Sequence, residues 1–578
     1  MTSREELWSA WNPGIGTGIP EALRDLETIF RPECVFGRRT DLEELVGLTG
    51  LPAEELARYR PARLALHELI VRITAEIAVA EGDEEEALGQ NFRRIALTLW
   101  EKDIAPRLPA IEQEYAALSA AVQNLVQQIL VETLFRQEVP ASPAKSARSL
   151  RAFFGRNKAA GGSKDGAAES PEAFEQRIIA GFKAAGLATD DALRRAVFKS
   201  LYRVLGAIAV KRGRLGADRE LLARLVSQQV CNDFGSRRIG ESIAPLIDAA
   251  IVREAYVRPP YREAPVLISL KGASAAGKSS LRPMIKQIMR EQGMAPESYV
   301  TVSPDIWRRL LLDYASLGAA YKYAGHLTGR ELMVIDGKLD RYIRRKANRD
   351  KAMPHLLVDR FRFDSFSSEK VARVLHNTYA SHVDTLLMYF VVTPPEATVE
   401  RGWLRGLERG RYKAVEDFLG HSVEAYTGMP KILFKWLAYK RPHFRYFFLD
   451  NSVPKGTFPS TIAFGNQAEM TLYDPVALIN IERYQKININ ATSPSAVYPS
   501  AEVLAMHANC GFLKECLRRI PIVNLAHPGS TQAYLRARKG RFELIDRAGL
   551  QLALVKPELR EILFEIAPEV LEGRSGAV

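Results

Sequence analysis

The chain has few cysteines, no hydrophobic run long enough to cross a membrane, and no apolar leader at its start. Its four cysteines, Cys34, Cys231, Cys510 and Cys516, are too few and too scattered for a disulfide framework, which favours a reducing compartment. The opening segment Met1 to Glu6 is polar and acidic, unlike a signal peptide. We therefore expect a cytoplasmic protein without a membrane partner, although a secretion route with no cleavable signal would leave no trace in the sequence.

Acidic residues are also in the minority. Lysine and arginine total 80 against 68 aspartates and glutamates, which gives a formal net charge of +12. Such a balance fits a nucleic-acid partner or phosphorylated small molecules equally well, so the position of the charges matters more than their sum. With 578 residues, 47% of the chain apolar and 26% charged, the composition is that of a soluble globular protein of about three to four domains.

Helical periodicity and breaks in composition divide the chain into five parts. We expect a helical N-terminal domain at 1–137, a flexible linker rich in Ala, Ser, Gly and Lys at 138–172, and a second helical region at 173–258. A candidate catalytic domain follows at 259–465, and a mixed, mostly helical C-terminal region occupies 466–578.

A phosphate-loop motif opens the candidate catalytic domain. The apolar run 264–270 predicts a buried strand, residues 272–279 match G-x-x-x-x-G-K-[ST] in full, and residues 281–289 carry apolar side chains at helical spacing. A strand, a loop and a helix in this order aim backbone N–H groups at an anion. We expect a nucleoside triphosphate to bind here, held by Gly272, Ala273, Ser274, Ala275, Ala276, Gly277, Lys278, Ser279 and Ser280.

Two aspartates are expected at the carboxyl ends of neighbouring strands. Asp305 follows the strand-like run 298–302, where a substrate hydroxyl would meet the γ-phosphate, and we expect it to be the general base. Asp305 is equally well placed to cap the helix that follows. Asp359 ends the run that begins at His355 and would hold Mg²⁺ with Ser279, or else serve a turn; Asp364 is the fallback.

Basic residues recur on a helix after the central strand 386–393. Arg401, Arg405 and Arg409 are spaced by four and share one helix face, and Arg411 follows Gly410. Stacked like charges repel one another, and a polyanion lying across them would remove that cost. These arginines therefore fit a kinase lid that stabilises the transferring group, or else a solvent-facing helix paired with its own glutamates.

Thr328 and Glu331 open a long helix with the spacing of a capping box, which is their ordinary structural role. The same helix ends in a basic cluster at 341–351. His507, Cys510, Cys516 and His527 match no compact zinc pattern, so we assign no zinc site.

Together these motifs resemble the zeta-toxin group of small-molecule kinases. The matching features are the phosphate loop, Asp305 with Arg308 as D-x-x-R, Thr328 with Glu331 as T-x-x-E, the arginines at 401–411, and the D-N-S at 450–452. The resemblance covers the candidate catalytic domain alone, and among its motifs the phosphate loop is individually specific.

The resemblance implies an α/β P-loop kinase core, a parallel sheet flanked by helices, that uses ATP and Mg²⁺. It implies that Lys278 holds the triphosphate, that Arg405, Arg409 and Arg411 stabilise transfer, and that Asp305, Arg308, Thr328 and Glu331 contact the acceptor. Family members phosphorylate nucleotide sugars such as UDP-N-acetylglucosamine, and a related effector kinase acts on the ribose of NAD. An antitoxin or chaperone is the partner class that this implies.

The leading hypothesis is thus a toxin- or effector-type kinase acting on a hydroxyl of a nucleotide-like small molecule. The alternatives are a polynucleotide kinase, which the basic cluster at 341–351 would suit, and a nucleotide-gated module that binds nucleic acid or protein. The helical N-terminal region is left open as a restraint, an oligomerisation surface or a targeting module.

Overall fold

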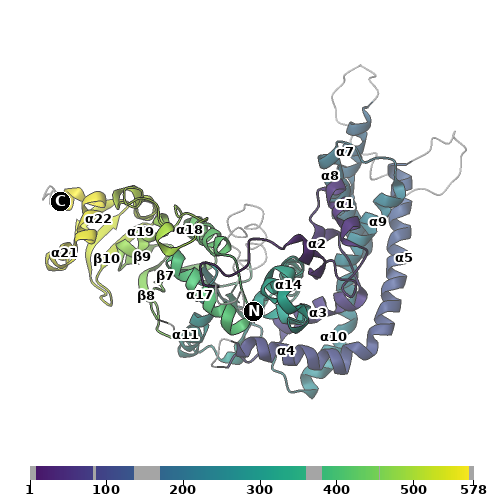
Figure 1. The fold of residues 1–578 in the computed structure, drawn as a ribbon, viewed down its shortest axis with the longest axis horizontal. Coiled ribbons are helices and arrows are strands. Elements are labelled where there is room, and N and C mark those ends of the chain that lie inside the picture. The colour runs from purple at the N-terminus through teal and green to yellow at the C-terminus, as the bar shows by residue number, and fades with distance from the viewer. Residues whose placement is uncertain (1–7, 83–85, 136–168, 360–380, 455, 572–578) are drawn as a thin grey trace, which may run out of the picture.

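The computed structural model describes residues 8–82, 86–135, 169–359, 381–454 and 456–571 (Figure 1). Most of the expected linker at 138–172 lies outside these residues, as does Asp364. In the described part, Ser170 accepts a hydrogen bond from the Ala173 N–H and so begins the next helix. None of the helices in these ranges combines the length and apolar composition needed to cross a bilayer.

The N-terminal part is a body of helices, here called the helical body. Its members are α1 (Arg39–Thr49), α2 (Ala53–Leu56), α3 (Pro61–Glu76), α4 (Ala87–Leu99), α5 (Leu108–Thr133), α7 (Pro171–Ala188), α8 (Ala192–Arg212), α9 (Arg219–Val230) and α10 (Ser236–Arg253), with a short ladder of β1 (Val35–Phe36) and β2 (Arg58–Tyr59). Helix α3 has buried side chains on all its faces, polar ones included, which marks it as the centre of the packing.

The rest of the described chain is built around a large, mostly parallel sheet. Its strands are β3 (Val266–Gly272), β4 (Tyr299–Val302), β5 (His355–Asp359), β6 (Thr385–Val392), β7 (His443–Asp450), β8 (Ser460–Asn466), β9 (Glu469–Leu472), β10 (Ile522–Ala526), β11 (Ala533–Arg538) and β12 (Arg541–Leu544). In the described residues their order is β12-β11-β10-β9-β8-β7-β6-β3-β5-β4. Strands β7, β6, β3, β5 and β4 run parallel.

The position of β3 determines where a ligand can bind. After β3 the chain moves to β4 and β5 on one side, and then to β6 and β7 on the other. Connections that leave a strand in opposite directions open a crevice at its carboxyl end. The loop after Gly272, the last residue of β3, therefore lies at this switch point.

Helices flank the sheet and continue beyond it. They are α11 (Lys278–Glu291), α12 (Arg308–Leu311), α13 (Ala324–Leu327), α14 (Gly329–Asp350), α17 (Pro395–Arg409), α18 (Val415–Leu437), α19 (Pro475–Arg483), α20 (Gly511–Arg519), α21 (Arg547–Leu554), α22 (Pro557–Ile566) and α23 (Pro568–Leu571). In Figure 1 the helical body and the C-terminal helices lie at opposite ends of an elongated molecule, with the parallel strands between them.

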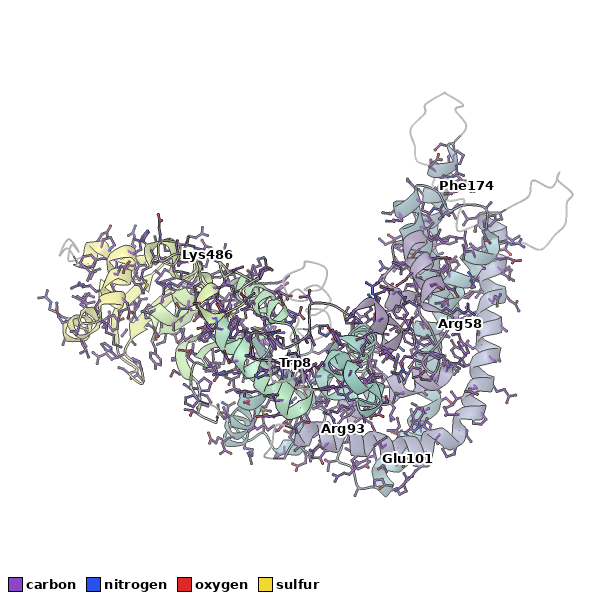
Figure 2. The ribbon with its side chains drawn as sticks, viewed as in Figure 1. Trp8, Arg58, Arg93, Glu101, Phe174 and Lys486 are labelled. Carbon is purple, nitrogen blue, oxygen red and sulfur yellow. The ribbon has the colours of Figure 1, made fainter. Side chains whose placement is uncertain are left out.

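The boundary expected at 465 falls inside β8. Strand β8 pairs antiparallel with β7 on one side and with β9 on the other, and β10 to β12 extend the same sheet. The strands of the C-terminal region therefore extend the same sheet that carries the phosphate-loop motif. Among the described residues, one large hydrophobic cluster includes buried side chains from Ile29 near the N-terminus to Leu563 of α22. Figure 2 shows side chains filling the molecule from Phe174 in the helical body to Lys486 near α19.

Candidate active site

The loop after β3 forms a rigid, polar-lined turn. Gly277 has φ of +91°, and a Cβ there would lie 2.2 Å from the amide nitrogen of Asn451, so a side chain at this position is excluded. That amide donates to the carbonyl oxygen of Ala276 at 2.7 Å, and the Thr393 hydroxyl donates to the same oxygen at 3.0 Å. Two strand ends on the far side of the loop thus hold its carbonyl outward and leave its N–H groups for an anion.

Lys278 begins α11 and turns its ammonium back toward the loop. Its Nζ donates to the carbonyl oxygens of Gly272 at 2.9 Å and Ala273 at 2.8 Å. Burial lowers the pKa of Lys278 to about 8, against the opposing influence of the carboxylates of Asp359 and Asp305. The loop lysine is therefore a desolvated charge, which strengthens its attraction to a phosphate.

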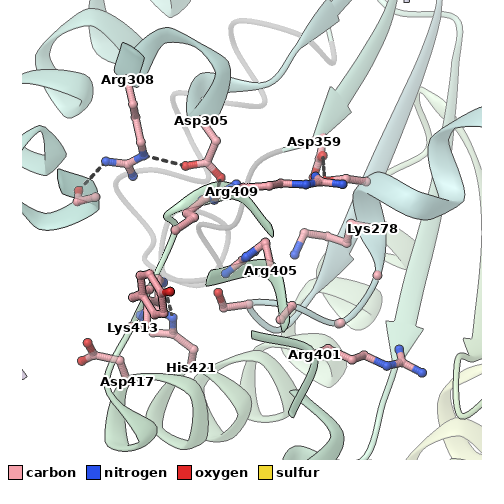
Figure 3. A pocket seen from close by; sticks show the side chains of 18 of the residues that line it. Lys278, Asp305, Arg308, Asp359, Arg401, Arg405, Arg409, Lys413, Asp417 and His421 are labelled. Atoms are coloured by element: carbon pink, nitrogen blue, oxygen red, sulfur yellow. Dashed lines mark hydrogen bonds and ion pairs between the residues drawn. The ribbon is translucent and has the colours of Figure 1, made fainter. Parts of the chain in front are cut away.

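The loop forms one wall of a cavity of about 990 Å³. Ligand sites in proteins measure about 300–1,000 Å³, so this cavity lies at the large end of that range. Figure 3 shows Lys278 and Arg405 pointing into a common space, with Asp305 and Asp359 at its upper side. The cavity lining includes loop residues 274–280, with Lys278 among them, as well as Asp305, Asp359 and Arg405.

Asp305 lies in a 3-10 helix (Pro304–Trp307) directly after β4 and faces two guanidinium groups. It accepts a hydrogen bond from Nε of Arg308 at 2.9 Å and pairs with Arg411. Burial alone would raise the pKa of Asp305, but the charges of Arg411 and Arg308 outweigh it and hold this pKa well below its usual range. The carboxylate is ionised and faces the cavity instead of capping a helix.

Arg308 is itself held by the segment before α14. Its second guanidinium arm donates to the Gly325 carbonyl oxygen at 2.6 Å and to the Thr328 hydroxyl at 2.8 Å. The Thr328 hydroxyl donates in turn to the Ala324 carbonyl oxygen at 3.0 Å. Thr328 was expected to contact the substrate that accepts the phosphoryl group. In the structure its hydroxyl accepts a hydrogen bond from Arg308, which in turn donates to Asp305.

Glu331 is placed away from the cavity. Its carboxylate is fully buried and accepts from Nε of Arg63 at 2.5 Å, from the other arm of Arg63 at 2.6 Å, and pairs with the His67 ring at 2.6 Å. Both oxygens are thus occupied by α3 of the helical body. The sequence-based expectation of a substrate contact is not met in this arrangement, because the helical body holds Glu331 in the interface.

Asp359 ends β5 beside the loop. Its carboxylate lies 3.4 Å from the Ser279 hydroxyl oxygen, and both residues line the cavity. A hydroxyl and a carboxylate in this relation are the pair that phosphate-loop enzymes use around Mg²⁺.

The arginines at 401–411 all line the cavity but have different partners. Arg401 donates to the carbonyl oxygens of Asn451 at 2.8 Å and Val453 at 3.0 Å, and Figure 3 shows it pointing away from Lys278. Arg409 lies 3.5 Å from Glu86 of the helical body. Arg405 and Arg411 extend toward Lys278 and Asp305 respectively.

The sequence analysis did not identify a second cluster of titratable side chains in the cavity. Nζ of Lys413 lies 3.2 Å from Nδ1 of His421, and Nε2 of His326 lies 3.2 Å from the carboxylate of Asp417. Burial, with Arg405 and Arg411 nearby, lowers the pKa of Lys413 to about 7. Lys413, Asp417 and His421 recur at every fourth position around the start of α18, a spacing that the sequence does show. His326 lies 91 positions from Asp417, so its place beside them has no local signal.

Sequence reasoning also missed the contribution of the N-terminal segment. Gly18, Ile19, Arg24 and Glu27 line the cavity with Arg330 of α14. These residues carry no motif, and their place depends on a contact between segments about 300 positions apart in a chain of 578.

In the C-terminal region, the Cys510 thiol donates to the Met506 carbonyl oxygen and the His527 ring contacts the Gly549 carbonyl oxygen.

Comparison with known proteins gives little beyond this geometry. No protein-family model matches the chain, and no curated protein matches it. Among solved structures, the chain is similar to one from the PezAT chromosomal toxin-antitoxin system of the human pathogen Streptococcus pneumoniae, with 13% identity and a TM-score of 0.25. That similarity covers 38% of this chain and 78% of the other, and a score this low supports no conclusion about function.

Proposed function

We propose that this chain is an ATP- and Mg²⁺-dependent kinase of the toxin or effector type, which transfers the γ-phosphoryl group to a hydroxyl of a nucleotide-like small molecule. The observation that carries the proposal is one cavity lined by a phosphate-loop lysine, the carboxylates of Asp305 and Asp359 at strand ends, and Arg405 and Arg411. A phosphoryl transfer needs these groups together, because its catalysis is positioning and charge stabilisation.

The loop residues fit a triphosphate and its metal. The Ala276 N–H donates to the Ala273 carbonyl oxygen at 3.3 Å. The other N–H groups of the loop and the Lys278 ammonium would hold the phosphate oxygens, and Ser279 with Asp359 would hold Mg²⁺. When bound, the metal neutralises charge on the phosphates. The φ of +91° at Gly277 supports this fit, since side chains rarely adopt that conformation and glycine lets the loop backbone turn tightly.

Asp305 would orient the acceptor hydroxyl. Its low pKa keeps it ionised over the physiological pH range, so it accepts the hydrogen bond of the incoming hydroxyl and takes its proton late in the transfer. The acceptor competes with Arg411 for this carboxylate. Arg411, once displaced, is within the same cavity as Lys278 and Arg405 and would stabilise the transferring group.

The nucleic-acid alternatives depend on the basic cluster of α14, which is partly paired within the chain. In the basic cluster of α14, Arg341 lies 3.3 Å from Asp233 and Lys346 lies 3.0 Å from Glu76. Both acids belong to the helical body, so Arg341 and Lys346 are paired within the chain, whereas Arg345, Arg349 and Lys351 of the same cluster are exposed. A backbone-binding surface needs its cations exposed to phosphates.

Transfer of label from ATP to a metabolite extract, followed by mass spectrometry, tests the proposal. We expect a phosphorylated small molecule with the wild type, and a rate lower by about 10²- to 10⁴-fold with Asp305→Asn. Asp384→Asn is the matched control, because the Asp384 side chain is about as exposed as that of Asp305. Asp384 pairs with Arg441 and directly precedes β6, so it lies at the amino ends of the strands, away from the cavity. A transfer rate of Asp305→Asn equal to that of the wild type, or release of inorganic phosphate as the sole product, would contradict the proposal.

A further inference from the structure

The segment 8–27, here called the N-terminal strap, crosses from one side of the cavity to the other. In Figure 1 the N-terminal end of the chain lies between α17 and α14, and Figure 2 places Trp8 in the same central position. Four strap residues line the cavity. The strap therefore forms part of the cavity wall.

Contacts at both ends fix the strap in place. The indole N–H of Trp11 donates to Glu400 of α17 at 2.7 Å. Nζ of Lys322 donates to the carbonyl oxygen of Pro13 at 3.1 Å, and the Thr28 N–H donates to the carbonyl oxygen of Leu327 at 3.0 Å. Apolar strap residues also pack on the cluster before α14, namely Ile19, Leu23 and Leu26. A wall held at several points can define the shape of a ligand.

Glu27 is a buried acidic residue of the strap. It is 3% exposed and lines the cavity. Among the described residues its carboxylate makes one ion pair, with Nε of Arg330 at 3.5 Å, whereas a charge-assisted hydrogen bond measures about 2.7–2.9 Å. Burial raises the pKa of Glu27 more than Arg330 and Arg24 lower it. A carboxylate accepts about four hydrogen bonds, so this single long contact leaves the carboxylate able to accept a hydrogen bond from a ligand in the cavity.

We propose that Glu27 is a specificity-determining residue, whose carboxylate accepts a hydrogen bond from a hydroxyl or amide N–H group on the acceptor, at the end remote from the transferred phosphoryl group. The inference rests on the proposed kinase function. It places the acceptor between Asp305 and the N-terminal strap, with the phosphate loop left to ATP. A partner that donates a hydrogen bond satisfies a buried carboxylate, and an acceptor lacking that donor leaves the carboxylate unpaired.

Kinetics with Glu27→Gln and Glu27→Ala test the inference. Wild type and variants are incubated with labelled ATP and a metabolite extract supplemented with UDP-N-acetylglucosamine and NAD. The molecule that gains phosphate is then purified, and its KM is measured. We expect the acceptor KM to rise by about tenfold or more in both variants, since a hydrogen bond to a charged group is lost, while kcat and the KM for ATP stay unchanged.

Glu21→Gln is the matched control, because Glu21 lies in the same strap with an exposed side chain that pairs with Arg39 at 2.8 Å. The Tm of Glu27→Gln should equal or exceed that of the wild type, since the variant removes an incompletely paired buried charge. An unchanged acceptor KM, or a collapse in Tm, overturns the role of Glu27 alone. If the wild type labels no small molecule, the proposed function and this inference fall together.

Discussion

Lys278 shows how the cavity tunes a single charge. Its ammonium donates hydrogen bonds to two carbonyl oxygens of its own loop, and burial lowers the pKa of Lys278 to about 8. Lysine carries its charge below its pKa, so the form that binds phosphate is lost as the pH rises through about 8. Lys413, with a pKa lowered to about 7, loses its charge in the same range.

A pH profile of kcat/KM for ATP therefore has a defined direction. We expect a plateau below about pH 6, where both lysines are charged, a fall approaching about tenfold per unit between about pH 7 and pH 8, and a steeper fall above pH 8, because kcat/KM reports the free enzyme. The double variant Lys278→Arg with Lys413→Arg should be slower but level across this range, since guanidinium does not titrate there. A wild-type profile that rises between pH 8 and pH 9 would contradict this assignment.

Single residues also show what the sequence can predict. The loop 272–279 and Asp305 were predictable because each follows a strand directly, and the local order of elements fixes where it faces. Glu331 was not, although its T-x-x-E spacing is intact. Its partner Arg63 lies 268 positions away, and a long-range contact of this kind has no local signal.

Helix α17 depends on two glycines for its position. A Cβ at Gly402 would lie 2.1 Å from the ring of Phe418, and one at Gly406 would lie 2.5 Å from the ring of Tyr412. Phe418 belongs to α18 and is buried. Arg405 and Arg409 are carried into the cavity because α17 lies this close to its neighbours.

Substitution of these glycines tests the helix position. Glycine to alanine within a helix normally stabilises by about 0.5–1 kcal/mol, but Gly402→Ala should destabilise by about 1–3 kcal/mol through overpacking and lower the transfer rate. Gly420→Ala on α18 is the control, because a Cβ there meets nothing within 4 Å. Thermal unfolding and transfer assays compare the two, and equal stability and activity would refute the role of Gly402.

The elements of the catalytic sheet differ in how well the sequence predicts them. The apolar runs in the sequence predicted buried strands at the positions of β3, β5, β6 and β7, and these strands are present. Strand β9 has four residues, and β12 alternates exposed and partly buried side chains. Such short strands gain their stability from neighbours in the sheet rather than from their own pattern, so the extension of the sheet beyond 465 was not foreseen.

On the scale of the whole molecule, the helical body is built into the catalytic part. Helix α14 packs against α3, and the Glu331 carboxylate, the Arg63 guanidinium and the His67 ring meet in their interface. Nζ of Lys338 extends this network to the His67 ring at 3.1 Å and the Ser236 hydroxyl at 2.6 Å. A shared hydrophobic cluster and a buried polar network together indicate a permanent interface.

Breaking this network should destabilise the entire chain. Glu331→Gln leaves the Arg63 guanidinium buried without a counter-charge, which costs about 3–5 kcal/mol in comparable pairs. Glu169→Gln, which removes an exposed partner of Arg177, should change stability by about 1 kcal/mol or less. Denaturation in urea measures both, and a Glu331→Gln variant as stable as Glu169→Gln would show that the interface does not hold the molecule together.

The binding of a nucleotide to the loop around Lys278 is the claim on which the proposed function depends. Calorimetric titration with a non-hydrolysable ATP analogue and Mg²⁺ measures it directly. We expect wild type and Asp305→Asn to bind with similar Kd, and Lys278→Ala to bind about tenfold or more weakly, because a desolvated charge facing the phosphates is lost. The absence of any binding heat with the wild type, or equal affinity in Lys278→Ala, would contradict the assignment.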